Sequence, residues 1–471
     1  MNLLPPTVTA LAYLAAAVLF ILALKAMSHP RTARRGNVLG IAGAVIAVVV
    51  VLLSTEFTSV NLIVVLAAIA VGAALAIPTA QRVKMTQMPQ LVALFNGVGG
   101  GAAALVGLIE LTETAVGVPG ALTVQVPAGT AAQVATAFGI VAGSASLSGS
   151  MVTFAKLQGL MTSRPVVLPA AGIAMAVVVL AGLAAAVWVA VTADVGAGVL
   201  TAVLALAAGV LLVLPVGGAD VPIVISLLNA LTGLAVAASG WAMGNTLLLV
   251  SGTLVGAAGS ILTGAMARAM GRSVTGILFG ALRGTTAGAT DTSDRPVRRA
   301  QAEDVAITLA YARRVVVVPG YGLAVAQAQH AVAELVTSLR ERGVDAVYGI
   351  HPVAGRMPGH MNVLLAEANV PYDLLIEAGD INPSMPNTDV VIVVGANDVV
   401  NPAARSDTRA PIYGMPIIDA DRAGQVVFLK RSMRPGFAGI DNELLFAERT
   451  QVLFGDAKDS LTAILGALAT V

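Results

Sequence analysis

Long runs of apolar residues dominate the first 267 positions of this 471-residue chain. A helix needs about 20 apolar residues to cross a hydrocarbon core of about 30 Å. Runs that approach or exceed this length lie at residues 8–26, 38–53, 60–77, 91–109, 131–151, 167–191, 196–214, 221–239 and 246–266. The pattern therefore predicts an all-α polytopic membrane helix bundle of about nine helices over residues 1–267.

The pattern changes beyond residue 267. Residues 268–311 are rich in Gly, Thr, Asp and Arg and are predicted to form a linker with a short helix near 302–310. From residue 312 to 471, short β-branched runs alternate with helical periodicity, which is typical of a parallel sheet whose strands are joined by helices. Predicted strands lie at 315–318, 345–350, 372–376, 388–394 and 425–429, and predicted helices at 323–342 and 362–368. The chain is thus expected to be multi-domain, with a Rossmann-like α/β domain after the helix bundle.

The composition supports this division. The chain is 57% hydrophobic and 11% charged, and residues 1–267 hold only eight of the 27 Lys and Arg and five of the 26 Asp and Glu. Such usage is far from that of soluble domains, so we expect lipid around the first part and water around the second. The net charge is +1, which gives no indication of a nucleic-acid partner, and there is no cysteine for disulfides or thiol chemistry.

Basic residues occur in alternate loops of the predicted bundle. Lys and Arg follow the first, third, fifth and ninth helices, at Lys25, Arg31, Arg34, Arg35, Arg82, Lys84, Lys156, Arg164, Arg268 and Arg272. The other loops and helix ends carry acids, at Glu56, Glu110, Glu113 and Asp194. Because Lys and Arg accumulate in cytoplasmic loops, the N-terminus is expected outside and the C-terminal domain in the cytoplasm.

A glycine turn follows the first predicted strand of the α/β domain. Gly320, Gly322 and Val325 form a GxGxxV pattern between a strand and a helix. Such a turn lets the backbone approach a pyrophosphate, and the helix start then offers free N–H groups to the anion. The alternative is a βα turn that binds no ligand.

The residues after the second strand indicate which dinucleotide is bound. NAD sites usually carry an acid there that bonds the ribose 2′-hydroxyl, whereas this chain has His351 and Arg356 in a stretch without any acid. After the last predicted strand come Lys430, Arg431 and Ser432, which suit a phosphate monoester. Although a solvated basic turn is the alternative for this cluster, the combination favours NADP(H).

A few polar residues fall within or beside the apolar runs. Asp220 lies at the cytoplasmic start of the eighth helix and is interpreted either as a helix cap or as a proton-path carboxylate. Asn229 lies nine residues further along, on the opposite side of the helix. Asn96 lies in the fourth helix, where an Asn more often bonds a neighbouring helix than carries a proton, and Glu110 is expected to close that helix as a solvated end.

Several long motifs match a known family. They are PGYGLAVAQAQ at 319–329, GIHPVAGRMPGHMN at 349–362, GANDVVNP at 395–402, KRS at 430–432, GDAK at 455–458 and, in the membrane part, GGAD at 217–220. From about residue 85 onward the chain resembles the beta subunits of proton-translocating NAD(P) transhydrogenases. That resemblance implies a Re/Si-specific enzyme in the bacterial cytoplasmic (inner) membrane that couples hydride transfer between NAD(H) and NADP(H) to proton translocation.

The resemblance also implies site residues and partners. The residues matching NADP(H)-binding positions are Gly320, Tyr321, Gly322, Ala324, Val325, His351, Arg356, Gly395, Ala396, Asn397, Asp398, Lys430, Arg431, Ser432, Gly436, Asp456 and Ala457. Lys430, Arg431 and Ser432 match the 2′-phosphate ligands, and Asp398 matches a coupling carboxylate near the nicotinamide. Positions tied to the proton path and its coupling are matched by Asp220, Asn229 and Arg272. No metal is implied.

The implied partner is an alpha subunit with the NAD(H) domain and further membrane helices, and the assembled unit is expected to be a homodimer. One departure concerns Asn96, where many relatives carry His. Because Asn does not take up a proton near neutral pH, either a relay His lies on the partner or the path differs.

Two other functions compete with this interpretation. A channel or transporter regulated by a cytosolic dinucleotide-sensing domain would need a filter-like loop or a charged ring, and the sequence shows neither. A membrane-tethered dehydrogenase for a small substrate would need its own general acid or base and a substrate pocket. The loop histidines His351 and His360 both lie in the predicted nucleotide-binding stretch.

Overall fold

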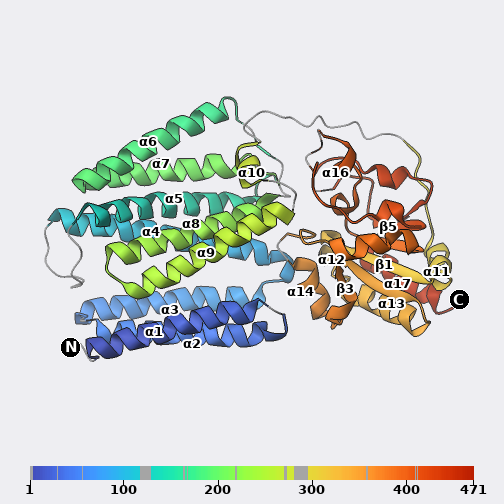
Figure 1. The fold of residues 1–471 in the computed structure, drawn as a ribbon, viewed down its shortest axis with the longest axis horizontal. Helices are drawn as coiled ribbons and strands as arrows, with labels where there is room; N and C mark the ends of the chain where they lie inside the picture. The colour runs from blue at the N-terminus through green and yellow to red at the C-terminus, as the bar shows by residue number, and fades with distance from the viewer. Residues whose placement is uncertain are drawn as a thin grey trace.

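The computed structural model describes residues 4–28, 30–55, 57–116, 129–162, 165–166, 168–217, 220–269, 273–280, 295–356, 359–408, 410, 412–436 and 438–471. Within these residues the chain forms a bundle of long helices and a separate sheet domain, which lie end to end along the long axis of the molecule (Figure 1). The predicted combination of a helix bundle and a parallel sheet is confirmed.

Nine helices within the described residues are long and apolar enough to cross a membrane. They are α1 (Pro6–Met27), α2 (Pro30–Ser54), α3 (Ser59–Arg82), α4 (Met88–Val116), α5 (Thr130–Gln158), α6 (Ala171–Thr192), α7 (Val195–Val213), α8 (Val221–Ala242) and α9 (Thr246–Ala269). Each of these helices includes all or most of one of the nine predicted apolar runs. A short helix, α10 (Val274–Gly280), follows α9.

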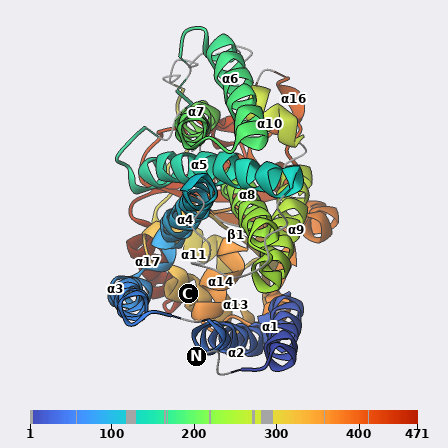
Figure 2. The ribbon, with the colours of Figure 1, turned by 90° about the vertical axis from the view of Figure 1, so that its left-hand side faces the viewer.

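Helix α5 is the centre of the bundle and packs against α4, α6, α7 and α8 (Figure 2). Small residues allow this close approach: a Cβ on Gly100 of α4 would lie 2.9 Å from the carbonyl oxygen of Gly143 on α5. Helix α3, by contrast, has no buried residue. Its apolar side chains, such as Leu75 at 69% exposure, face outward as a lipid-contacting surface requires.

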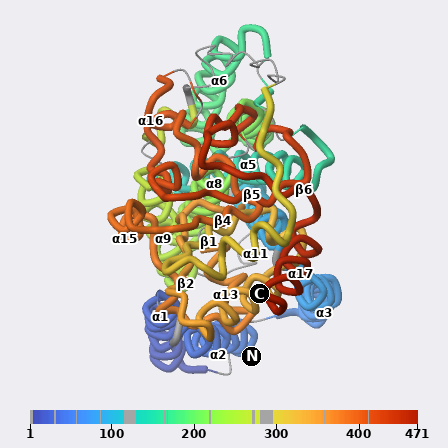
Figure 3. The backbone as a smooth tube through the Cα atoms, turned by 90° about the vertical axis from the view of Figure 1, so that its right-hand side faces the viewer, coloured from blue at the N-terminus to red at the C-terminus, as the bar shows by residue number. Residues whose placement is uncertain are grey.

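The sheet has six parallel strands in the order β3-β2-β1-β4-β5-β6. Their bounds are β1 (Arg314–Pro319), β2 (Asp345–Ile350), β3 (Leu375–Glu377), β4 (Val390–Val394), β5 (Gln425–Lys430) and β6 (Thr450–Phe454). This order is that of a dinucleotide-binding fold, and Figure 3 shows β2, β1, β4, β5 and β6 following one another across the domain. Every residue of β4 is buried, as the continuous β-branched run predicts.

Helices cover both faces of the sheet and close its core. They are α11 (Ala302–Ala310), α12 (Tyr321–Val325), α13 (Gln329–Glu341), α14 (His360–Glu367), α15 (Ala378–Ile381) and α17 (Ala457–Leu468). The short helix α16 (Ala403–Ser406) belongs instead to a separate apolar cluster, in which Ala404 is grouped with Ile223 of α8, Met266 of α9 and Ile277 of α10. Helix α11 packs on α17. Beside α11, Arg299 bridges to Val452 of β6, so the end of the predicted linker is joined to the edge of the sheet.

The structure corrects four details of the sequence prediction. The helix expected over 323–342 is interrupted between α12 and α13, where Gln327 adopts a φ of 50°. The strand expected at 372–376 is largely a 3₁₀ turn, and only Leu375–Glu377 pairs with β2. The edge strand β6 was not predicted, and Lys156 lies within α5 rather than in the loop after it.

Candidate functional site

A crevice lies where the strand order of the sheet reverses. β1 and β4 are neighbours, but the chain leaves them toward opposite edges, and such a switch point is where open α/β sheets bind ligands. Gly320 N donates to Val394 O and Gly322 N to Gly395 O, each at 2.9 Å. The glycine turn after β1 is therefore held directly against the turn after β4.

This contact leaves no room for side chains. A Cβ on Gly320 would lie 2.5 Å from Ala396 Cα, and one on Gly322 would lie 2.6 Å from Gly395 Cα. Gly395 also has a φ of +66°, which favours glycine. The backbone of both turns is thus bare at the crevice, as close approach to a pyrophosphate requires.

A cavity of about 300 Å³ opens along this edge of the sheet. It is lined by Gly322, Gly395, Ala396, Asn397, Leu429, Lys430, Arg431, Ser432, Arg434, Pro435, Gly455 and Ala457. A second cavity of about 510 Å³ adjoins it and shares Asn397, Lys430 and Pro435. The turns after β1, β4, β5 and β6 therefore meet in one place, which unites most of the residues that the motifs single out.

The three residues after β5 differ in their surroundings. Arg431 and Ser432 are exposed on the cavity rim, where a ligand phosphate could reach them. Lys430 turns inward, and its Nζ donates to Asn397 Oδ1 at 3.1 Å. Burial lowers the pKa of Lys430, while the charges of Asp398 and Asp441 oppose that shift.

Asp398 ties the segment that follows β5 to the turn after β4. Its Oδ1 accepts from Asn397 Nδ2 at 3.0 Å and its Oδ2 from Ala438 N at 2.8 Å. Asn442 adds a hydrogen bond from Nδ2 to Asn397 O at 3.1 Å. Gly436 completes the contact, because a Cβ there would lie 2.5 Å from Asp398 Oδ1. Ala438 and Asn442 had no sequence signal, since their contacts depend on how this segment folds back.

His351 is buried and engaged within the protein. Its Nδ1 accepts from Val353 N at 3.3 Å, so Nε2 carries the hydrogen and donates to Pro416 O at 2.6 Å. Burial lowers the pKa of this imidazole, and the ring is neutral near pH 7. His351 therefore shapes the turn after β2 with an uncharged ring.

Arg356 lies at the junction between the two parts of the molecule. Its Nη1 donates to Leu157 O at the end of α5 at 3.0 Å, and Gln90 Nε2 reaches the same carbonyl at 3.2 Å. The guanidinium also lies 4.3 Å from the centre of the Tyr321 ring. Two residues expected near the nucleotide are thus joined to the membrane helices in this structure.

The other predicted positions are placed as follows. Ala324 and Ala396 are buried, and Val325 is 44% exposed. Asp456 Oδ1 caps α17 by accepting from Lys458 N at 2.9 Å, and Ala457 begins that helix. Arg272 lies outside the described residues.

A polar group occupies the middle of the bundle. Asn96 Nδ2 on α4 donates to Ser146 Oγ and Ser150 Oγ on α5, at 3.2 and 2.9 Å. Ser146 Oγ in turn donates to Leu228 O on α8 at 2.9 Å and lies 2.5 Å from Thr232 Oγ1. Asn96 thus bonds neighbouring helices, as predicted, and it does so through a chain of hydroxyls.

Asp220 is buried at the N-cap position of α8, with 9% exposure, but its side chain makes no capping hydrogen bond. The simple helix-cap interpretation is therefore not supported by the geometry. Asn229 is half-buried further along the same helix.

Lys156 was missed as a buried cation. Its side chain is on α5, and Nζ donates to the carbonyl oxygens of Val213, Leu214 and Val216, at 3.0, 2.6 and 2.9 Å. These carbonyls end α7 and lead into the turn before Asp220. The ammonium therefore fixes the end of α7 and the start of that turn.

No group of three or more His, Cys, Asp or Glu among the described residues could hold a metal ion.

Comparisons with known proteins show which family this chain resembles. A family model described as NAD(P) transhydrogenase beta subunit matches residues 9–467. Two curated sequences named NAD(P) transhydrogenase subunit beta, both from Rhodospirillum rubrum, are each 45% identical to this chain over 468 residues, covering 98% of this chain and 99% of theirs.

Proposed function

The chain belongs to the family of NAD(P) transhydrogenase beta subunits, and from this membership we propose that it binds NADP(H) at the carboxyl edge of its sheet. We propose further that it couples hydride transfer between NADP(H) and NAD(H) to proton translocation. Use of a nicotinamide dinucleotide and an alpha-subunit partner follow from the family. Within the described residues, nothing favours the regulated-channel alternative.

The observation that carries the proposal is the switch-point crevice between the turns after β1 and β4. Its bare glycine backbone fits a pyrophosphate, and Arg431 and Ser432 on the rim fit a phosphate monoester. The turn after β2 offers a neutral, buried His351 instead of the acid that NAD sites use. A 2′-phosphate at the turn after β5 would meet the Arg431 cation and the Ser432 hydroxyl.

Hydride transfer requires a second nucleotide. When bound, the nicotinamide ring would supply the hydride-carrying carbon, and this chain's residues would position the nucleotide and exclude water. Reaction needs two such rings at near-contact distance, and the sequence contains one dinucleotide turn. We therefore assign NAD(H) to the alpha subunit, with Re/Si-specific transfer between the two, in an assembled homodimer surrounded by lipid.

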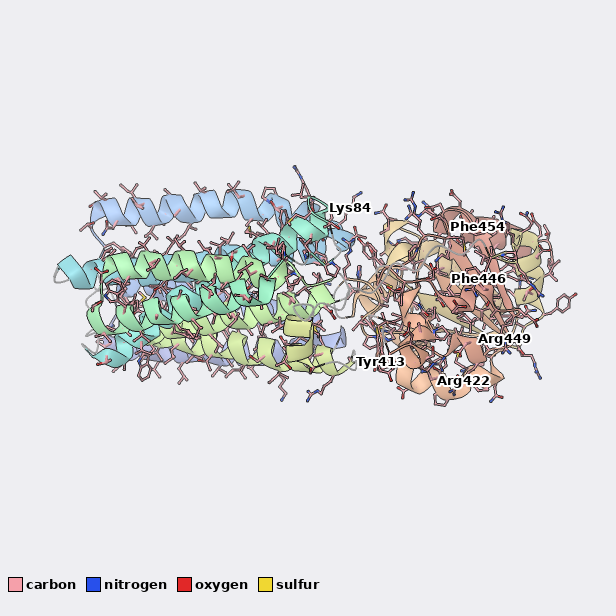
Figure 4. The ribbon with its side chains drawn as sticks, turned by 90° about the horizontal axis from the view of Figure 1, so that it is seen from above. Lys84, Tyr413, Arg422, Phe446, Arg449 and Phe454 are labelled. Atoms are coloured by element: carbon pink, nitrogen blue, oxygen red, sulfur yellow. The ribbon has the colours of Figure 1, made fainter. Side chains whose placement is uncertain are left out.

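The proposed orientation places the sheet domain in the cytoplasm of a bacterial cell, under the inner membrane, with the N-terminus outside. Lys84, which follows α3, lies where the bundle meets the sheet domain (Figure 4). Lys156, near the end of α5, lies beside Leu157, which contacts Arg356 of that domain. The basic ends of α3 and α5 therefore share the side that the positive-inside rule makes cytoplasmic.

For the proton path we propose Asp220 as the titratable group nearest the sheet domain, with Asn229 further into the membrane and Arg272 as a link between the domains. The hydroxyls of Ser146, Ser150 and Thr232 near Asn96 support such a path, since a hydroxyl can both donate and accept a hydrogen bond.

Calorimetry on the purified full-length chain tests the nucleotide assignment. We expect tight NADP(H) binding and much weaker NAD(H) binding. Arg431→Ala should weaken NADP(H) binding by about 1.5–3 kcal/mol, the size of a hydrogen bond to a charged group. Arg313→Ala is the control, because that side chain is 93% exposed and lies just before β1, at the amino-terminal ends of the strands and away from the crevice. Equal affinity for NAD(H) and NADP(H) would refute the assignment.

A further inference from the structure

Glu110 is not a solvated helix end. Helix α4 continues to Val116, so Glu110 lies almost two turns inside it and within an apolar span. Thr136 of α5 is buried at 3% exposure, and its Oγ1 donates to Glu110 Oε2 at 3.0 Å. A carboxyl at membrane depth is costly and in membrane proteins usually serves a function.

Glu110 and Asn96 lie on the same face of α4. They are 14 residues apart, which is about 3.9 helical turns and about 21 Å along the axis. Asn96 contacts α5 at Ser146 and Ser150, and Glu110 contacts it at Thr136. Both polar groups therefore belong to the seam between α4 and α5.

Glu110 lies at the end of this seam that is remote from the sheet domain. Leu157 of α5 contacts Arg356 of the sheet domain, and Thr136 precedes Leu157 by 21 residues. That separation is about 31 Å of helix, close to the whole hydrocarbon thickness. Asn96 lies between the two ends.

An apolar side chain separates the two polar groups. Ile140 of α5 is fully buried and packs into the gap left by Gly107 of α4, where a Cβ would lie 2.8 Å from Ile140 Cγ1. Around it, small residues such as Gly100 and Gly143 bring the backbones together. Asn96 Oδ1, beyond this barrier, is buried without a hydrogen-bond partner among the described residues. Such an oxygen is satisfied when a water molecule enters the seam.

We propose that Glu110 is the proton-carrying group at the mouth of the path remote from the sheet domain, and that Ile140 is the apolar plug between it and the Asn96 hydroxyl chain. The carboxylate takes a proton from hydronium and leaves water, and the carboxylic acid later gives the proton to water that enters the seam. The reverse steps carry a proton outward. This inference rests on the proposed function, whose proton path it extends.

Few charges surround Glu110 to compete for this role. On its own helix Glu113 lies one turn further on and is half-buried. On α7, Asp194 is exposed, and its Oδ2 caps that helix by accepting from Ala197 N at 2.7 Å. The described residues of α5 and α8 carry no charged side chain in this half of the bundle.

The test uses this chain reconstituted with its alpha subunit in proteoliposomes. Glu110→Gln keeps an oxygen that can accept from Thr136, so it preserves the contact between helices but removes the proton site. Coupled proton transport should fall at least 10-fold, lose its dependence on the pH of the far side, and recover in part in Glu110→Asp. Glu113→Gln is the matched control and should transport normally.

Ile140→Ala should have the opposite effect on permeability. With the plug shortened, passive proton leak should rise several-fold and the number of protons moved per hydride should fall. Normal transport by Glu110→Gln, or an equal defect in Glu113→Gln, would overturn the role of Glu110. If the Ile140→Ala variant leaks protons no faster than the unmodified protein, Ile140 does not act as the plug. If the unmodified enzyme moves no protons, the proposed function fails, and this inference fails with it.

Discussion

Replacing Gly395 by alanine should impair nucleotide binding, whereas the same replacement at Gly343 should not. Gly395 has a φ of +66°, and a Cβ there would collide with Leu323 N and Gly322 Cα and lie 2.5 Å from Gly322 C. Those atoms form the turn whose N–H groups are expected to face the pyrophosphate. The turns after β1 and β4 must therefore separate before the side chain fits.

The magnitude follows from comparison with Gly343, which follows α13 and lies at the amino-terminal ends of the strands, away from the crevice. Gly343 has a φ of +85° but nothing within 4 Å of its would-be Cβ. Both variants carry the left-handed backbone cost of about 1–2 kcal/mol. Only Gly395→Ala adds the overpacking cost of about 1–3 kcal/mol, and that cost falls on the binding turn.

The assay is NADPH affinity of the full-length chain in detergent, together with its thermal midpoint. We expect Gly395→Ala to bind at least about 10-fold more weakly, the equivalent of about 1.4 kcal/mol. Gly343→Ala should lower the midpoint slightly and leave the affinity within about two-fold. If the two variants bind NADPH equally well, the two turns do not form the site.

Three further predictions concern buried polar groups. Asp220→Asn should strongly slow proton-coupled turnover in proteoliposomes, whereas Asn96→Ala should slow it much less; near-normal pumping by Asp220→Asn would remove Asp220 from the path. Lys156→Met should destabilise the bundle by about 3 kcal/mol, because three carbonyls lose a charged donor, and a thermal midpoint equal to that of the exposed control Lys84→Met would contradict this. Burial, with the charge of Arg356, lowers the pKa of His360 to about 4. The stability from neutral His360 is therefore complete above about pH 6.5 and is lost as the pH falls toward 4, by on the order of 2 kcal/mol. His360→Gln should flatten that decline in the thermal midpoint and exposed His330→Gln should not; identical pH profiles would show that His360 does not cause the decline.

Local pattern was sufficient to predict the elements that dominate the fold. The apolar runs predict each membrane helix because length and hydropathy suffice there, and continuous β-branched runs predict β1 and β4. The edge strand β6 was missed because it begins with Thr450 and Gln451, which leave an apolar run of only three residues. The break between α12 and α13 was missed because the apolar spacing continues through Gln327.

The candidate site shows a similar division. The glycine turn and the KRS cluster were visible in sequence, since residue type and position after a strand define them. The sequence could not show that these turns meet at one site, because contacts such as that of Gly322 with Gly395 depend on the order of the strands in the sheet. Residue type gave the least information about the hydrogen bonds of His351 and Lys156. Their acceptors, at Pro416 and at the end of α7, lie about 60 residues away in the chain.

The central claim is that NADP(H) chemistry at the crevice drives proton movement through the bundle. The most direct measurement is hydride transfer from NADPH to an NAD analogue by this chain and its alpha subunit in sealed proteoliposomes, with the pH difference across the membrane set beforehand. The account predicts that transfer moves protons across the membrane, that an opposing gradient slows it, and that this chain without the alpha subunit transfers no hydride. A transfer rate that is the same with and without a gradient, or transfer by this chain alone, would contradict it.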